Sequence, residues 1–292
     1  MDDGDFIKED VFSEWATDSS GLRGEFLNQW FDRQLHYTAA TCLNSSIGNY
    51  TKAYETWKRN YNIIKAIKRI LPSRRINYTI MDMGCGTGYH LFSLNARFKL
   101  LDCQLVGMDL AKLDIFFAEE IKKKLNTGNL QFVVGDATDS GLPGESFDLI
   151  LCSELLVHIK NPYKCIAEIK RLLKPGGHCI ISTPNKDNWM IKLGNFFKRL
   201  SLRAPGEQAY STEEGEIISV KGTKEWKDIF KDQDLKLKKL YRGSPIWGGG
   251  DRYNRQRIFF AFLLITDKIL DWLPFTKNIS ENVVYLVQKS KP

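Results

Sequence analysis

The 292-residue chain lacks several features that would place it in a special class of protein. Its six cysteines, at positions 42, 85, 103, 152, 165 and 179, form no C-x-x-C pair and have no histidine at ligand spacing, which argues against a zinc site or a disulfide framework. No apolar run reaches the roughly 18 residues needed to cross a bilayer. The acidic start, Met1 to Asp5, lacks the basic and apolar regions of a signal peptide. We therefore expect a cytoplasmic protein, soluble or peripherally attached to a membrane, with no metal site.

The composition is that of a globular protein with unevenly distributed charge. Hydrophobic residues make up 43% of the chain, which is ample for a core at this length. Residues 1–18 carry seven acids against Lys8, whereas residues 52–75 carry eight cations against Glu55. Residues 1–24 are weakly periodic, so they are expected to form a flexible acidic arm.

Residues 25–72 are predicted to form a helical cap. Apolar residues recur at three- and four-residue intervals up to Leu71, and Pro72 ends the pattern. The cations of the second helix are expected to form its solvated face, with a phosphate-binding patch as the alternative. They are Lys58, Arg59, Lys65, Lys68 and Arg69.

Strand-like and helix-like segments alternate in residues 73–292. Strands separated by helix-length segments predict an α/β fold, a doubly wound parallel sheet with helices on both faces. Insertions are expected at 186–222 and 243–281. The expected strands are 80–83, 104–108, 130–134, 147–152, 178–182, 235–241 and 282–288, and the expected helices lie near 88–98, 111–125, 162–173 and 226–230.

The most informative stretch runs from Tyr78 to Gly88, an apolar strand followed by G-x-G-x-G. Glycine lets the backbone turn sharply and approach a ligand, and the helix that follows presents free amides to it. Tyr89 stands where the dinucleotide fingerprint needs its third glycine, so a pyrophosphate ligand is disfavoured. The stretch predicts a nucleotide-type site.

Acidic residues follow the next two strands, at the edge where ligands bind in such sheets. Asp109 lies 25 residues after Gly84 and is expected to accept hydrogen bonds from a ribose diol; alternatively, it caps a helix that begins at Leu110. Asp136, with Ala137 beside it, is expected to accept a hydrogen bond from an adenine amino group.

The string Asp82-Met83-Gly84-Cys85-Gly86-Thr87-Gly88 resembles the first motif of class I S-adenosylmethionine-dependent methyltransferases. The spelling is similar to the small-molecule branch, which includes ubiquinone-pathway and natural-product enzymes. The resemblance implies a Rossmann-like seven-stranded sheet of order 3-2-1-4-5-7-6 with strand 7 antiparallel. It also implies S-adenosyl-L-methionine as cofactor and S-adenosyl-L-homocysteine as product. The cofactor-binding positions that it implies are Asp82, Gly84, Cys85, Gly86, Thr87, Gly88, Asp109, Leu110, Asp136, Ala137 and Ser153.

His158 is the candidate catalytic residue. Leu155 to Ile159 resembles a short helix with a histidine that is found in many small-molecule members, and an imidazole titrates near neutral pH. A histidine that merely supports the site is the favoured interpretation.

Residues 258–273 are too apolar for an ordinary surface loop. They are expected to form a lid or to pack in the core, with a dimer face or a membrane-interface helix as alternatives. The residues predicted to share one helical face are Ile258, Phe262, Ile265, Ile269 and Trp272, preceded by Arg252, Arg255 and Arg257.

The resemblance and these residues together predict that the protein transfers a methyl group to a small molecule, and that the receiving group is a hydroxyl on an apolar or lipid-linked metabolite. Peripheral contact with a membrane through 252–275 is also expected, and a nucleic acid is not expected as a partner. The alternatives are an RNA methyltransferase that uses the basic helix at 58–75 and a non-catalytic S-adenosylmethionine-binding protein.

Overall fold

The computed structural model describes residues 50–71, 77–100, 102–188, 211–212, 215–216, 218–244 and 280–291, together with 265–267, 269–270, 273 and 276. The predicted acidic arm, the first part of the helical cap and most of both predicted insertions lie outside these residues.

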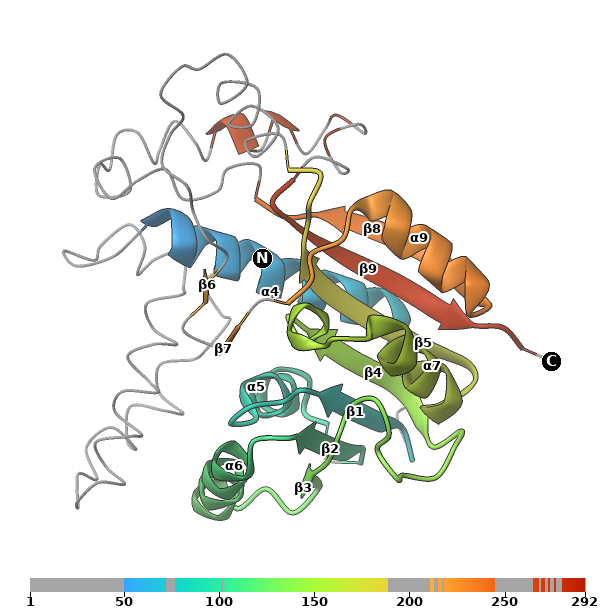
Figure 1. Ribbon diagram of the computed structural model, residues 1–292. Coiled ribbons are helices and arrows are strands. Elements are labelled where there is room, and N and C mark those ends of the chain that lie inside the picture. The colour runs from blue at the N-terminus through green and yellow to red at the C-terminus, as the bar shows by residue number, and fades with distance from the viewer. Residues whose placement is uncertain are drawn as a thin grey trace.

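Seven strands form one sheet, in the order β3-β2-β1-β4-β5-β9-β8 (Figure 1). All pairs are parallel except those of β9, which runs antiparallel to β5 and β8. Because β8 and β9 are the sixth and seventh strands of this sheet along the chain, the predicted order and the antiparallel last strand are confirmed. The strands are β1 (Thr79–Met83), β2 (Gln104–Asp109), β3 (Leu130–Val134), β4 (Phe147–Ser153), β5 (Leu173–Pro184), β8 (Leu235–Arg242) and β9 (Asn282–Lys289); β6 (Ser211–Thr212) and β7 (Gly215–Glu216) form a separate small ladder.

Helices cover both faces of the sheet, because alternate strand residues feed two apolar cores. Ile80 and Leu149 belong to the core under α4, α5 and α6, whereas Met81 and Ile150 belong to the core under α7 and α9. The helices are α4 (Tyr50–Ile70), α5 (Tyr89–Phe98), α6 (Lys112–Leu125), α7 (Pro162–Leu172) and α9 (Thr223–Asp232), with a 3-10 turn η1 (Leu156–His158). Within the described part of the chain, no helix is long and apolar enough to cross a membrane.

The strand predicted at 178–182 is longer in the structure, since β5 runs from Leu173 to Pro184 and includes Pro175 to Gly177. The register against β4 shifts between Phe147 and Leu149. A Cβ at Gly177 would lie 2.9 Å from a backbone oxygen, so the irregular start of β5 requires glycine there.

The prediction that the five cations of the basic helix are exposed to solvent is wrong for two of them. Lys65, Lys68 and Arg69 are exposed on α4 as expected. Lys58 is buried instead, and its Nζ lies 2.9 Å from Asp267 Oδ2. Arg59 is also largely buried, because α4 packs against the end of the sheet.

Asp267 joins α4 to the end of β8. Arg242 donates to the Asp267 carboxylate and, at 2.8 Å, to its backbone oxygen. Asn62 Nδ2 on α4 donates to the Arg242 carbonyl at 2.7 Å. Two buried cations therefore share one buried carboxylate, and this group fixes α4 against the sheet.

The orientation of the 265–270 segment differs from the predicted one. Ile265 and Ile269 are 61% and 60% exposed, whereas Asp267 is fully buried. The prediction that these two isoleucines pack in the core is therefore wrong. The ion pairs of Asp267 turn the polar side of the segment inward instead. The remaining residues of the predicted apolar face lie outside the described residues.

β8 is an edge strand of the sheet, and lysines mark its outer surface. Lys236, Lys238 and Lys239 are exposed, whereas Leu235 and Tyr241 are buried. The ladder to β9 is interrupted between Leu237 and Lys239.

Asp267→Asn is expected to lower the free energy of unfolding by about 3–5 kcal/mol, because it leaves two buried cations without a counter-charge. The matched control is Asp228→Asn on the exposed side of α9, which should change stability by at most about 0.5 kcal/mol. Urea denaturation measures both. A loss for Asp267→Asn no larger than the control's would show that α4 does not depend on this ion group.

Candidate functional site

The glycine loop, Gly84 to Gly88, leaves the carboxyl end of β1 and leads into α5. The backbone amides of Gly84 and Cys85 both donate to the Met108 carbonyl of β2, at 2.8 and 3.0 Å. All three glycines have positive φ angles of 49–85°, a left-handed conformation that L residues rarely adopt. The loop is therefore a rigid turn.

The three glycines meet different surroundings. A Cβ on Gly84 would lie 2.9 Å from Leu155, and one on Gly88 would lie 2.7 Å from Phe132, so close packing excludes side chains at both positions. A Cβ on Gly86 would meet nothing within 4 Å. Gly86 faces open space in which a ligand could approach the backbone.

Asp109 binds the glycine loop from the neighbouring strand. Its Oδ2 accepts from the Gly86 amide at 2.8 Å, and its Oδ1 accepts from the Ala111 amide at 2.9 Å. The alternative of a helix that begins at Leu110 is wrong, because α6 begins at Lys112. Each carboxylate oxygen has a further lone pair, so Asp109 retains the capacity to accept from a ligand hydroxyl.

Asp82 is fully buried beneath the loop. Neither of its oxygens has a hydrogen-bond partner in the described part of the chain, although His90 Nδ1 lies 3.6 Å from Oδ2. A buried carboxylate without a donor is costly, so this one suits a ligand that brings a cationic donor. Burial, together with Asp82 and Asp109, raises the pKa of the Cys85 thiol well above its usual value, so Cys85 serves as a neutral wall of the loop.

His90 was missed by the sequence reasoning. It lies in the first turn of α5, and its Nε2 is 3.4 Å from Asn60 Oδ1 on α4 while its Nδ1 faces Asp82. The position directly after a glycine loop was the only signal in the sequence. The contact with α4 depends on a helix 30 residues earlier.

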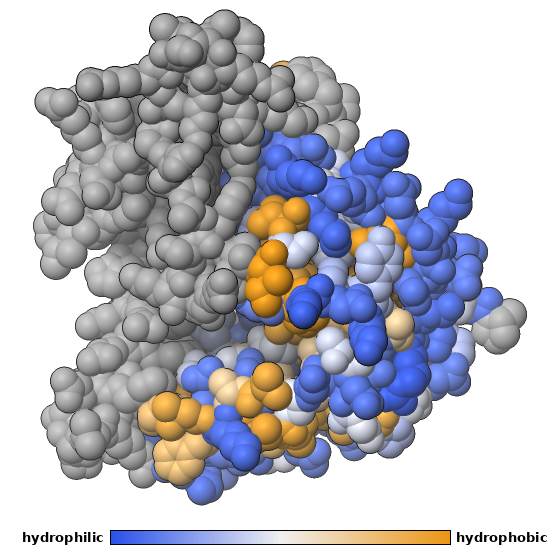
Figure 2. All heavy atoms as spheres, in the orientation of Figure 1, coloured by the Kyte–Doolittle hydropathy of each residue, from blue (hydrophilic) through white to orange (hydrophobic). Residues whose placement is uncertain are grey.

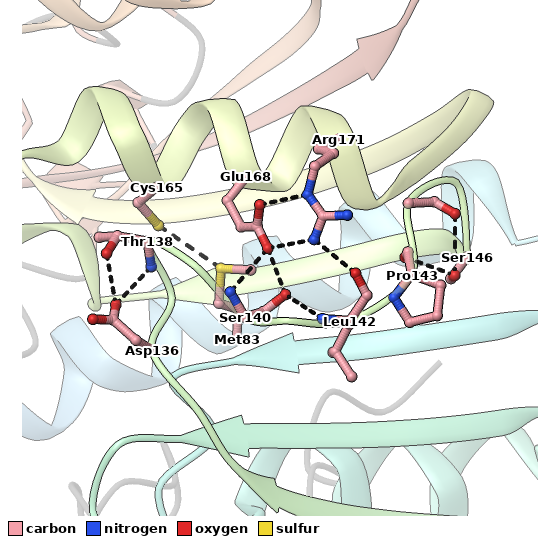
Figure 3. Close-up of polar contacts among 11 residues, drawn as sticks. Met83, Asp136, Thr138, Ser140, Leu142, Pro143, Ser146, Cys165, Glu168 and Arg171 are labelled. Atoms are coloured by element: carbon pink, nitrogen blue, oxygen red, sulfur yellow. Dashed lines mark hydrogen bonds and ion pairs between the residues drawn. The ribbon is translucent and has the colours of Figure 1, made fainter.

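Asp136 leaves the end of β3 and is exposed. Its Oδ1 accepts from the Thr138 amide at 2.7 Å and from the Thr138 hydroxyl at 2.8 Å, and these bonds lower the Asp136 pKa (Figure 3). Ala137 between them is half-buried.

Figure 3 also shows what holds the segment after Asp136. Glu168 on α7 accepts from the Ser140 amide at 3.0 Å and from its hydroxyl, and it is paired with Arg171 at 2.7 Å. Arg171 first, and then Ser140, hold the pKa of Glu168 at about 2. Asp136 therefore begins a β3–β4 connection whose later part, at Ser140, is bound to α7 through Glu168.

Apolar side chains gather beside Asp109. Leu110, Leu113 and Phe116 are 58–70% exposed, and the patch over α6 is visible at the lower left of Figure 2. Leu110 follows the acidic residue directly, so the edge offers an apolar surface next to a hydrogen-bond acceptor. Such a pair suits a flat base joined to a sugar.

Ser153 and His158 lie at the exit of β4. Ser153 Oγ is 2.9 Å from Ser182 Oγ on β5. His158 is half-buried at the end of η1, as the predicted short helix requires. The backbone of η1 is bound by the segment before α9, since Val157 O accepts from the Ile218 amide at 2.8 Å.

The strand order sets the predicted site residues out in a row. Asp136 follows β3, Asp109 ends β2, the glycine loop follows β1 and Ser153 ends β4, and these four strands are neighbours in that order. None of the predicted site residues is a cation, so the row suits a ligand rich in donors and positive charge rather than a pyrophosphate. In the described residues no group of three or more His, Cys, Asp and Glu side chains is arranged to hold a metal ion. Fold and edge together define an α/β protein of the nucleotide-binding type.

Comparison with known proteins narrows this class. Residues 75–234 match a family model described as "Methyltransferase domain", which is more than half of the chain. The chain belongs to this family and is a class I S-adenosylmethionine-dependent methyltransferase. The predicted methyltransferase family, the predicted fold and the predicted enzyme class are thereby confirmed.

Several relatives share parts of the sequence. An uncharacterized protein of Methanocaldococcus jannaschii is 25% identical over 205 residues, which is 66% of this chain and 91% of that protein. A ubiquinone biosynthesis O-methyltransferase of Albidiferax ferrireducens is 35% identical over 37% of this chain and 41% of its own length. A tRNA U34 carboxymethyltransferase of Glaesserella parasuis is 24% identical over 44% and 38%, respectively. The matches to these two enzymes span less than half of either protein.

Solved structures share the fold. Geranyl diphosphate methyltransferase in complex with S-adenosylmethionine aligns with a TM-score of 0.55 at 13% identity, over 86% of this chain and 94% of that chain. Phosphoethanolamine N-methyltransferase 2 of Haemonchus contortus aligns with a TM-score of 0.53 at 19% identity, over 81% and 53%. At these identities the likeness shows the fold alone.

The cofactor of this family, S-adenosylmethionine, fits two features of the structure. The open space at Gly86 admits a ligand against the backbone, and the Asp82 carboxylate, which has no hydrogen-bond partner in the described residues, suits an ammonium group. When bound, this cofactor supplies a methyl group on a positively charged sulfur.

Gly86→Val is expected to abolish S-adenosylmethionine binding, because the side chain would fill the open space at the loop. Gly141→Val is the matched control: Gly141 also has a positive φ and open space at its Cβ, but it lies in the connection between β3 and β4. Isothermal titration calorimetry measures both affinities. Wild-type affinity in Gly86→Val would place the cofactor elsewhere.

Proposed function

We propose that this methyltransferase acts on a small molecule and transfers the methyl group to a hydroxyl on an apolar or lipid-linked metabolite. The observation that carries the proposal is the polarity of the edge beyond the glycine loop. Hydroxyl, amide and carboxylate side chains gather at the exits of β4 and β5 and at the start of β9. Ser182 Oγ and Asn282 Nδ2 donate to Glu154 there, and the oxygen atoms of these groups can still accept from hydroxyl donors on an acceptor molecule.

In this proposal, the residues at each strand end contact a different part of the cofactor. Asp109 accepts from the ribose diol, and Asp82 receives the amino group. Asp136 and Ala137 read the adenine, and Leu110 packs against its ring. Ser153 lies at the methionine end, and the loop from Gly84 through Cys85, Gly86 and Thr87 to Gly88 provides the close backbone surface.

The charge distribution on α4 disfavours RNA as the acceptor. The half of α4 at the site carries Glu55 and Arg59, and both interact with carboxylates there. The exposed cations Lys65, Lys68 and Arg69 lie roughly 9–15 Å farther along the helix axis than Arg59. Phosphates bound by these cations would lie away from the methyl donor.

The apolar character of the acceptor is supported by the segment that Asp267 fixes to α4. Asp267 meets Lys58, one residue before Arg59, so this segment lies near the site half of α4. Ile265 and Ile269 face outward there and offer apolar surface to an acceptor or to a membrane that carries it. We include in this proposal a peripheral contact with a membrane through 252–275. The similarity to an enzyme named for ubiquinone biosynthesis supports an apolar acceptor.

The acceptor class is tested with S-adenosylmethionine labelled in its methyl group. We expect label to enter the organic-soluble, small-molecule fraction of a cell extract and not purified total RNA from the same cells, with Gly86→Val as the inactive control. Label that enters RNA in a salt-sensitive manner would overturn the small-molecule proposal.

His158→Asn is expected to retain turnover within about tenfold of wild type, with an unchanged pH profile, because a supporting histidine can be replaced by a side chain of similar hydrogen-bonding capacity. A general base contributes about 10²- to 10⁴-fold, so the two roles are separable. The control is Lys160→Gln, an exposed neighbour. A loss of several orders of magnitude at unchanged cofactor affinity would make His158 the base.

A further inference from the structure

A group of charged residues lies where β4, β5 and β9 meet α4. The "carboxylate cluster" comprises Glu154 after β4, Glu281 before β9, and Glu55 and Arg59 on α4. The sequence did not single out the three glutamates as site residues, because they come from three separate parts of the chain; Arg59 was considered only for a phosphate-binding patch. Their position beside the cofactor row requires an explanation beyond the family's cofactor contacts.

Glu154 is held in one position. Its φ is +58°, a left-handed conformation that costs free energy for a residue other than glycine. Its Oε1 accepts from Ser182 Oγ at 3.0 Å and from Asn282 Nδ2 at 2.7 Å, and its Oε2 lies 3.6 Å from Arg59 Nη1. Strain compensated by three partners is typical of a functional position.

Glu281 and Asn282 show that the cluster is incomplete. They are 5% and 1% exposed, and Glu281 Oε2 and Asn282 Oδ1 have no hydrogen-bond partner in the described part of the chain. Asn282 Oδ1 is an acceptor, and Glu281 Oε2 accepts when that oxygen carries no proton. The orphaned atoms therefore call for a ligand group that donates or is positively charged.

The cluster has a net negative charge. Burial, followed by Glu55, raises the pKa of Glu281 well above its usual value and so favours its neutral form. Glu55 and Glu154 contribute two formal negative charges, and Arg59 offsets one of them. One negative charge remains at a largely buried place, where water screens it weakly.

Glu154 directly precedes a residue that lies against the glycine loop. Leu155, the following residue, is the side chain that a Cβ on Gly84 would meet at 2.9 Å. β4 is the direct neighbour of β1 and lies on the side away from β2 and Asp109. A cofactor whose ribose is at Asp109 and which crosses the loop arrives, two strand spacings of about 5 Å each later, at the exit of β4.

We propose that Glu154 makes the site selective for the charge state of the cofactor. Its carboxylate favours S-adenosylmethionine, whose sulfur is positively charged, over S-adenosylhomocysteine, whose sulfur is neutral. After the methyl group leaves, the product loses this attraction and is released more readily. The inference rests on the cofactor placement given under Proposed function.

The test compares two affinities in each variant. In Glu154→Gln, which keeps the shape and removes the charge, the Kd for S-adenosylmethionine is expected to rise about fivefold, while the Kd for S-adenosylhomocysteine stays within about twofold of wild type. Glu154→Asp keeps the charge and tolerates a positive φ, so its ratio of the two Kd values should stay near that of wild type. Glu145→Gln, at the opposite end of β4, is the matched control and should change neither. Calorimetry on the full chain measures all of them.

Equal changes in both affinities for Glu154→Gln would mean that Glu154 is structural and would overturn the inference. If this variant melts below the assay temperature, Arg59→Gln provides the same test with the opposite sign, because it leaves the cluster more negative. Its affinity ratio should shift towards S-adenosylmethionine, and an unchanged ratio would overturn the inference. Wild-type protein that binds neither compound, or Gly86→Val that binds both normally, would overturn the cofactor placement itself and the inference with it.

Discussion

One backbone carbonyl organises the site. Met108 O, at the end of β2, accepts the amides of both Gly84 and Cys85, and this fixes where the glycine loop turns. The turn is sterically allowed because its glycines lack a Cβ. With the loop fixed to β2, Asp109 reaches the Gly86 amide and α5 starts directly above the buried Asp82. The order of the strands then determines which other residues can lie on the same line.

Much of this was predictable because it depends on local patterns. Apolar strands, helical periodicity and a glycine loop are read from neighbouring residues, and the parallel crossovers follow from their alternation. Asp109 and Asp136 could be placed on one edge from the sequence because the carboxyl ends of parallel strands lie there, and the family resemblance added Asp82 and Ser153.

The errors have a common physical cause, which is pairing over long distances in the chain. Lys58 was assigned to solvent by its helical position, but its partner Asp267 lies 209 residues later. The same ion group reversed the expected orientation of Ile265 and Ile269. His90 and Glu154 were not predicted as site residues because each is defined by a contact with α4, which lies far from it in the sequence. A local pattern tells which residues can share a face, but not which distant charge will be buried against them.

The lysines of β8 have a consequence for the behaviour of the molecule at high concentration. The outer edge of a sheet exposes unpaired amides and carbonyls, and two such edges from different copies can join into a continuous ladder. Lys236, Lys238 and Lys239 would bring like charges together in that arrangement, and the interrupted ladder between Leu237 and Lys239 spoils the flat register that it needs. The edge strand therefore protects the folded enzyme against aggregation.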